Sequence, residues 1–342
     1  MLSSSAMASG QATTGRRERR RRWRWLRGLA IGTAIGAPVL AHALIQRRVR
    51  PPRPPRWGHG HRYAGRHGEI AFQALGDGPA VVLLHSLGPG HDVAEWERAA
   101  EILADRFAVY ALDLPGWGRS DPPYAYRPAA YADALEDFLA GVVREPAAVV
   151  AAGLAAAYAV EVAARRPDLV RGLALVAPSG LEASGGRSGS WSAGRAGVRR
   201  LAAMPLVGTT ALDLATSRAA LARHLRQEVY AAPERVDAAL VEHHYRTSHL
   251  PPARRTLAAY LAGRLRPPAR ALAEEAAEVA QPVWIGWGRA AAQPPVECAD
   301  LWLQRLPQAE LDVFESAGNL PHAERPALFC RALEDFLAAL PG

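Results

Sequence analysis

Two side chains in this sequence carry functional groups suited to nucleophilic catalysis. Ser86 has a hydroxyl directly after an apolar run that ends at His85, and His322 has an imidazole three residues after Asn319. A serine hydroxyl becomes a nucleophile when a base is held in hydrogen-bond contact with it, and histidine accepts protons near neutral pH. Ser86 as candidate nucleophile and His322 as candidate base are therefore one hypothesis. The alternative is that His322 caps or hydrogen-bonds within the loop before the last helix.

The sequence offers little support for a metal or a cofactor. His243, His244 and His249 lie close together, but a metal site needs further ligands at suitable geometry, and a solvated helix face is the simpler interpretation. Cys298 and Cys330 do not have the spacing of a metal motif, and one possible disulfide does not define a redox compartment. We expect no metal and no cofactor.

The charge of the chain is concentrated at its N-terminus. The net charge is +8, but residues 1–56 contain thirteen Arg and one acidic residue, a net of +12, so the remainder carries −4. The folded part is therefore mildly acidic, and the basic balance does not indicate a nucleic-acid-binding domain. With 49% hydrophobic residues, the chain can bury a large core.

The Arg-rich N-terminal segment, residues 1–56, contains a possible membrane anchor. Residues 28–45 are almost entirely apolar, are flanked by Arg on both sides and are followed by a Pro/Arg linker. Their length is at the lower limit for a single span, which typically needs ~20 residues. We expect a membrane anchor of undefined orientation. A cleaved signal peptide with a site near residues 41–43, an organellar transit peptide and an incorrectly assigned start remain alternatives.

Beyond the linker, short apolar runs alternate with helical patterns. This alternation predicts a mostly parallel sheet with helices on both faces, in which ligands bind at the carboxyl ends of the strands. Residues 57–180 and 281–342 form this α/β core, and the Ala/Arg-rich residues 181–280 are predicted to form an inserted helical cap. The predicted strands are residues 69–76, 80–85, 107–114, 147–152, 170–177, 282–287 and 310–315.

Three motifs, in order and spacing, resemble those of the α/β-hydrolase superfamily, in particular its capped branch of epoxide hydrolases, haloperoxidases, dehalogenases and esterases. The motifs are LLHSLG at residues 83–88, DLPGWGRSD at 113–121 and AGNLPHAERP at 317–326. The resemblance covers roughly residues 63–340. It implies an α/β-hydrolase fold with a Ser–Asp–His triad.

All three triad positions implied by the resemblance hold other residues. The nucleophile of the Gly-x-Ser-x-Gly elbow corresponds to Gly153, the acid to Ala291 and the base to Asn319. Gly153 keeps no side-chain oxygen, and Asn cannot take up a proton near pH 7. The backbone N–H groups of Leu87 and Leu154 would still form an oxyanion hole, because backbone donors do not depend on side-chain identity.

The sequence therefore predicts a membrane-anchored, non-catalytic pseudohydrolase that binds a ligand or a partner, with a small apolar molecule expected under the cap. One alternative is an active hydrolase, resembling esterases or epoxide hydrolases, that uses non-standard residues such as His322. Another is a structural or interaction protein with a filled pocket. Secretion after signal cleavage is the alternative to membrane anchoring, and nucleic acid is not an expected partner.

Overall fold

The computed structural model describes residues 47, 49–52, 54–182 and 207–341. The proposed anchor at residues 28–45 and the Gly/Ser-rich part of the predicted cap lie outside these residues. Among the helices of the described ranges, none combines the length and the hydropathy that a membrane span requires.

Eight strands form one sheet in the order β1-β2-β4-β3-β5-β6-β7-β8, in which β2 is antiparallel to both of its neighbours and all other pairs are parallel. The strands are β1 (His59–Gly65), β2 (Gly68–Leu75), β3 (Ala80–Leu84), β4 (Ala108–Leu112), β5 (Ala147–Ala152), β6 (Val170–Val176), β7 (Val283–Gly288) and β8 (Ala309–Phe314). The central strands β3 and β5 are buried along their whole length, as expected for strands covered on both faces. This architecture confirms the predicted fold class.

The sequence patterns did not reveal the edge strand β1. Its first residues, His59 to Arg62, are exposed and polar, so they show no alternation of apolar side chains. The strand forms by pairing with β2 through the tight connection between Gly65 and Gly68.

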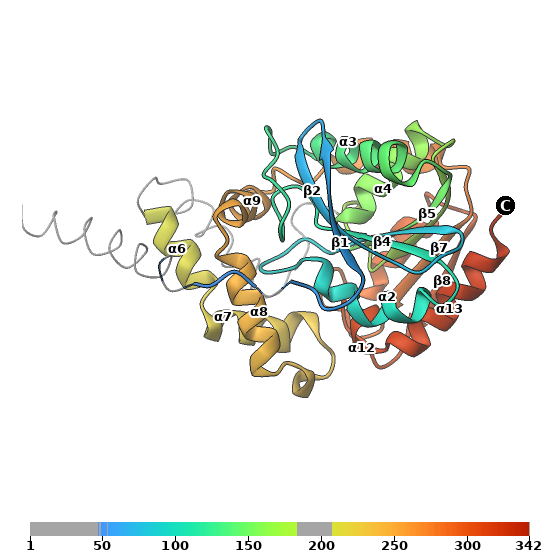
Figure 1. The fold of residues 1–342 in the computed structure, drawn as a ribbon. Coiled ribbons are helices and arrows are strands. Elements are labelled where there is room, and N and C mark those ends of the chain that lie inside the picture. The colour runs from blue at the N-terminus through green and yellow to red at the C-terminus, as the bar shows by residue number, and fades with distance from the viewer. Residues whose placement is uncertain (1–46, 48, 53, 183–206, 342) are drawn as a thin grey trace, which may run out of the picture.

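Helices cover both faces of the sheet (Figure 1). On one face lie α2 (Glu97–Leu103), α12 (Pro321–Glu324) and α13 (Pro326–Ala339), with the 3₁₀ turn η1 (Val93–Trp96) leading into α2. On the other lie α3 (Pro128–Phe138), which continues into the π-helical turn η2 (Leu139–Val143), α4 (Ala155–Arg165) and α11 (Ala299–Leu303) with its preceding turn η5 (Val296–Cys298).

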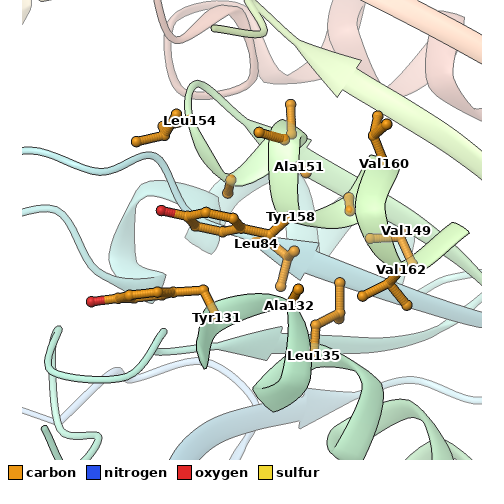
Figure 2. Close-up of a cluster of buried hydrophobic side chains, with 14 of the residues drawn as sticks. Leu84, Tyr131, Ala132, Leu135, Val149, Ala151, Leu154, Tyr158, Val160 and Val162 are labelled. Atoms are coloured by element: carbon orange, nitrogen blue, oxygen red, sulfur yellow. The ribbon is translucent and has the colours of Figure 1, made fainter. Parts of the chain in front are cut away.

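Small side chains allow α4 to approach β5 closely. Ala151 on the strand is fully buried against α4, and Tyr158 on α4 stacks on Tyr131 of α3 with ring centroids 5.0 Å apart (Figure 2). The Tyr158 hydroxyl donates to the carbonyl of Leu265, which satisfies a polar group inside this apolar cluster. The close packing fixes the turn between β5 and α4, where the site is built.

Between β6 and β7 the chain forms a helical segment. It comprises α6 (Val207–Ala215), α7 (Arg218–His224), the π-helical turn η3 (Leu225–Val229), the 3₁₀ turn η4 (Pro233–Arg235), α8 (Ala238–Ser248), α9 (Pro251–Leu261) and α10 (Ala269–Glu278). Helices α6 to α8 lie to one side of the sheet (Figure 1). In contrast, α10 packs on α4 in the core through Leu272 and Ala276, so the range 181–280 contains a core helix as well as the cap.

Candidate functional site

Gly153 occupies the apex of the turn between β5 and α4. Its φ of +58° lies in the left-handed region, which glycine adopts without the strain that a side chain would add. Its N–H donates to the carbonyl of Val176, and its own carbonyl accepts the N–H of Ser179. The sharp turn on which this fold normally presents a nucleophile is thus present, with no side chain on it. A Cβ placed on Gly153 would lie 3.5 Å from the Cβ of Ser86.

Asn319 and Ala291 lie in the loops after β8 and β7. The Oδ1 atom of Asn319 accepts the N–H of Ala292 at 3.0 Å and faces that of Gln293 at 3.4 Å, while its Nδ2 donates to the carbonyl of Gln293. Ala291 itself is buried, and its side chain offers no polar atom to this arrangement. The Asn319 amide therefore joins the two loops through backbone groups and is held in place on both of its polar atoms.

Ser86 belongs to a buried polar cluster with His91 and Glu95. Its hydroxyl donates to Oε2 of Glu95 at 2.8 Å and lies 2.7 Å from Nδ1 of His91. The same Nδ1 lies 2.8 Å from Glu95 Oε2, and Oε1 of Glu95 accepts the Ser86 N–H at 2.7 Å. Both hydroxyl and imidazole therefore converge on one carboxylate.

Glu95 is held as an anion by this cluster. Burial alone would raise the pKa of its carboxyl, but the imidazoles of His322 and His91 outweigh burial and keep the pKa well below the ordinary value. A carboxylate of such low pKa is a weak base, and the Ser86 hydroxyl already donates to it. The arrangement thus differs from a triad, in which the hydroxyl meets the imidazole nitrogen opposite to the one that contacts the carboxylate.

His322 lies behind this cluster. Its side chain has no exposed surface, stacks on Trp96 with ring centroids 3.8 Å apart, and brings Nε2 to 3.5 Å from Glu95 Oε1. His322 lies in α12, directly before the last helix α13 (Pro326–Ala339), but among the described residues neither of its ring nitrogens has a hydrogen-bond partner, so the expectation that it caps or hydrogen-bonds there is wrong. Among the described residues that line the cavity beside Gly153, His322 is not present.

The cavity beside Gly153 has a volume of about 100 Å³. Leu87 and Leu154, the predicted oxyanion residues, both line it. Within the described ranges, neither of their N–H groups donates to another protein atom. The described lining is Ser86, Leu87, Gly88, Pro89, His91, Gly153, Leu154, Ala177, Ser179, His224, Glu228, Val229, Tyr260, Gln293, Asn319 and Leu320.

The cap adds a buried carboxylate to the wall of this cavity. Glu228 lies on η3, and its side chain is only 6% exposed. Its Oε2 atom accepts the amide of Gln293 at 3.1 Å and lies 3.3 Å from Nδ1 of His224. Turn η3 is tied to the core because the N–H of Asn319 donates to the carbonyl of Val229 at 2.9 Å. Glu228 is therefore placed beside the position of the expected base.

Helix α8 docks on the loop that carries Ser86. His243 forms an ion pair with buried Asp92, with Nε2 2.9 Å from Oδ1, and Nδ1 of His244 lies 2.9 Å from the Pro89 carbonyl. Burial lowers the pKa of His244 to about 3, so this imidazole is neutral and donates through Nδ1. His244 and His249 are both buried, so their interpretation as part of a solvated face is wrong.

His91 and Glu95 were missed in the sequence. The available signal was their four-residue spacing, which brings two side chains together on a helical turn. Cys298 and Cys330 are free thiols. In the described part of the chain, no group of three or more His, Cys, Asp or Glu side chains is arranged to hold a metal ion.

The fold and the motifs around this site define an α/β-hydrolase. The model of the Alpha/beta hydrolase family matches residues 81–332, and the chain belongs to this family. It is 34% identical over 270 residues to pimeloyl-[acyl-carrier protein] methyl ester esterase of Chromobacterium violaceum, covering 78% of this chain and 98% of the esterase. It is 30% identical over 322 residues to the uncharacterized protein Rv2715 of Mycobacterium tuberculosis, covering 85% of either chain.

Solved structures share the fold. Cfl2 from Burkholderia cenocepacia superposes with a TM-score of 0.70 at 23% identity, covering 84% of this chain and 99% of Cfl2. The 2-hydroxy-6-oxo-6-phenylhexa-2,4-dienoate hydrolase of Rhodococcus superposes with a TM-score of 0.68 at 21% identity, covering 82% of this chain and 99% of the hydrolase.

Proposed function

We propose that this chain is a ligand-binding pseudohydrolase, a member of the α/β-hydrolase family that holds a small molecule beside Gly153 without acyl-transfer chemistry. The observation that carries the proposal is the state of Asn319. Its amide replaces the imidazole of a base and is engaged with the backbone of residues 292 and 293. No proton acceptor faces Gly153 from this position, and Gly153 has no hydroxyl to activate.

The preserved part of the site supports binding. The left-handed turn at Gly153 and the N–H groups of Leu87 and Leu154, for which the described residues provide no acceptor, favour an oxygen acceptor such as a carbonyl. The cavity of about 100 Å³ is smaller than the engineered cavity of about 150 Å³ that binds benzene. It therefore favours a small molecule at this position.

An active hydrolase is the second candidate, favoured by the 2.7 Å contact between the Ser86 hydroxyl and His91. In this reaction the Ser86 oxygen would attack an ester carbonyl, and the hydroxyl proton would pass to the His91–Glu95 pair and then to the leaving alcohol. The low pKa of Glu95 argues against it, because that carboxylate is a poor proton acceptor.

One experiment separates the two candidates. The purified full-length chain is assayed with short- and medium-chain activated esters, next to Ser86→Ala and His322→Ala variants. Hydrolysis at the buffer background in all three proteins is the expected result. Turnover by the wild type that Ser86→Ala abolishes would establish the second candidate and overturn the first. If the wild type neither hydrolyses nor binds these esters, the structural or interaction protein is favoured instead.

We also propose that residues 28–45 tether the protein to a membrane. The apolar segment with Arg on both sides supports this proposal. The test compares the full chain with a variant that lacks residues 1–56 in a membrane flotation assay. The full chain is expected to float with the vesicles and the shortened chain to stay behind. Release of a chain that begins near residue 44 into the medium would support the signal-peptide alternative instead.

A further inference from the structure

We propose that residues 229–232 of the cap, called the strap below, form a gate at the cavity beside Gly153, and that Glu324 latches this strap to the core. The strap connects the turns η3 and η4. The gate goes beyond the proposed ligand-binding function, because it concerns access to the cavity and not what the cavity binds.

The strap contributes to the walls of two neighbouring spaces. Val229 lines the cavity of about 100 Å³, and Tyr230, the next residue, lines a larger hollow of about 610 Å³ between η1 and α8. Leu320, in the loop after β8, lines both spaces. A movement of the strap away from Leu320 therefore opens a path between the hollow and the cavity.

The carboxylate of Glu324 joins the strap to the core. Its Oε2 atom accepts the N–H of Ala231 at 2.9 Å and that of Ala232 at 3.3 Å, both in the strap. Its Oε1 atom accepts the N–H of Gly318, in the loop after β8, at 2.6 Å. Glu324 is only 1% exposed, so water does not replace this acceptor unless the strap moves.

Glu324 itself is fixed on the core side. It belongs to α12, and its N–H donates to the carbonyl of Leu320 at 2.9 Å. In the same helix, His322 stacks on Trp96 with ring centroids 3.8 Å apart. When the strap is released, the Glu324 carboxylate therefore stays with the core.

The other contacts of the strap are local. The N–H of Asn319 donates to the Val229 carbonyl at 2.9 Å, and a Cβ on Gly318 would lie 2.4 Å from that carbonyl oxygen. The apolar cluster at this place has five buried side chains, four from the cap and Leu320 from the core. It is separate from the two larger core clusters, so a local opening of the strap leaves those clusters packed.

Glu324→Gln in the full chain tests the latch, because a carboxylate has two acceptor oxygens and an amide has one. Whichever way the Gln side chain is turned, its NH₂ group faces an N–H donor of either the strap or Gly318, and the bridge is broken. Glu315→Gln is the matched control. Glu315 also follows β8, but its side chain is 71% exposed and pairs with Arg289.

Hydrogen–deuterium exchange followed by mass spectrometry measures the release of the strap. Residues 226–236 and 316–320 are expected to exchange at least about tenfold faster in Glu324→Gln than in the wild type, because buried donors lose a charged acceptor. Exchange in β3 and β5 should stay unchanged, and Glu315→Gln should match the wild type throughout. Glu324→Asp keeps the charge but is one methylene shorter, so it should accelerate the same two segments.

A thiol in the cavity tests whether the strap controls access. Ser86→Cys supplies it, since Ser86 lines the cavity and is 9% exposed. Its alkylation by iodoacetamide, followed by mass spectrometry, should be at least about tenfold faster when Glu324→Gln or Glu324→Asp is added. The free thiol of Cys298 is the internal control and should react at the same rate in all of these proteins.

Each result decides for or against the gate. Exchange of the strap at the wild-type rate in Glu324→Gln would overturn the latch, and equal acceleration in β3 and β5 would show a general loss of stability instead. Faster exchange with unchanged alkylation, or alkylation of Ser86→Cys as fast as in the urea-unfolded chain, would overturn the gate. The ligand-binding function would stand in each case, since neither measurement uses a ligand. If Glu324→Gln does not fold, Glu324→Asp decides.

Discussion

His243 on the cap and Asp92 in the core form an ion pair with 2.9 Å between Nε2 and Oδ1. Asp92 is 3% exposed and also caps η1 by accepting the N–H of Ala94. The pair therefore joins α8 to the segment that carries Ser86 and His91. Because the Asp92 carboxylate is buried, the protonation of His243 controls whether its charge is balanced.

The ion pair predicts a pH-dependent stability of the protein. Burial opposes the charge of each partner, but the mutual attraction outweighs it, so the pKa of His243 is raised and that of Asp92 is lowered. The His243 contribution is fully present below its ordinary pKa of 6.5 and is lost as the pH rises through the raised value. The Asp92 contribution is present above its ordinary 3.8 and is lost as the pH falls through the lowered value. His243→Gln is expected to lower the free energy of unfolding by about 1–3 kcal/mol near pH 6.

The measurement is urea unfolding of wild type and His243→Gln between pH 5 and 9. The difference between the two proteins should shrink as the pH rises above 7. Other groups face the pair, namely Asp113, Arg119, Glu97 and His244. Burial and the charge of Asp92 raise the pKa of Asp113 to about 7. Both proteins should therefore lose stability as the pH rises from about 4 to 7, because the unfolded chain releases the Asp113 proton at a lower pH than the folded one. A difference that is independent of pH would contradict the role of the His243 charge.

Substitution of Gly90 is expected to disturb the packing of α8 on the loop that carries Ser86. Its φ is +79°, and a Cβ at this position would lie 2.4 Å from the His244 carbonyl oxygen and 2.5 Å from its Cα. Gly90→Ala must therefore move α8 away, and we expect it to cost more than about 3 kcal/mol in unfolding free energy. The measurement is chemical denaturation followed by tryptophan fluorescence.

Gly263→Ala is the control for backbone strain. Gly263 has a φ of +73°, but a Cβ there would meet no atom within 4 Å. The variant should lose only about 1–2 kcal/mol, the cost of a left-handed conformation for a residue with a side chain. Equal losses at the two glycines would show that the contact between Gly90 and α8 contributes little.

The charge of Glu95 is expected to stabilise the folded protein, and this stabilisation should be lost in acid. Its pKa is held well below the ordinary value of 4.5, so its contribution is present above that pH and disappears as the pH falls through the lowered pKa. Glu95→Gln keeps the shape and removes the charge, and we expect it to destabilise the protein at pH 7 by about 2–4 kcal/mol because the donors around it lose a charged acceptor. Thermal unfolding between pH 2.5 and 7 measures it. The gap between wild type and variant should narrow toward the acid end, and a gap that does not narrow would contradict the assignment.

Much of the fold could be predicted from local patterns, but less of the site. The apolar runs that became β3 and β5 are buried on both faces, so their composition identifies them, whereas polar β1 forms only through pairing with β2. The left-handed turn at Gly153 is a local property of a strand, a glycine and a helix rich in small residues, and it could be anticipated from the sequence.

The residues that the sequence did not reveal depend on long-range packing. Glu95 resembles any acidic residue in a helical turn, and its burial follows from contacts with Ser86, nine residues earlier, and with His322, which is far away in the chain. Glu228 reaches the cavity because η3 binds the loop at Asn319 through Val229. No local pattern encodes either contact, so the sequence alone suggested Ser86 and His322 while it missed the carboxylate between them.

Substitutions that restore the three triad side chains test whether their absence is what prevents ester hydrolysis at this site. A serine at Gly153 fits the available space, since its Cβ would be 3.5 Å from Ser86, but the φ of +58° costs about 1–2 kcal/mol. Gly153→Ser alone should stay at the background rate of ester hydrolysis, because Asn319 remains bound to the backbone of the neighbouring loop and cannot accept a proton.

The triple variant Gly153→Ser, Ala291→Asp, Asn319→His supplies nucleophile, acid and base, respectively. We expect it to hydrolyse p-nitrophenyl acetate at least about tenfold faster than Gly153→Ser, with a pH dependence near neutrality from the new histidine. Mass spectrometry of the acetylated protein locates the nucleophile. Acetylation of Gly153→Ser at the same rate as the triple variant would show that another base, such as His91, already serves this position.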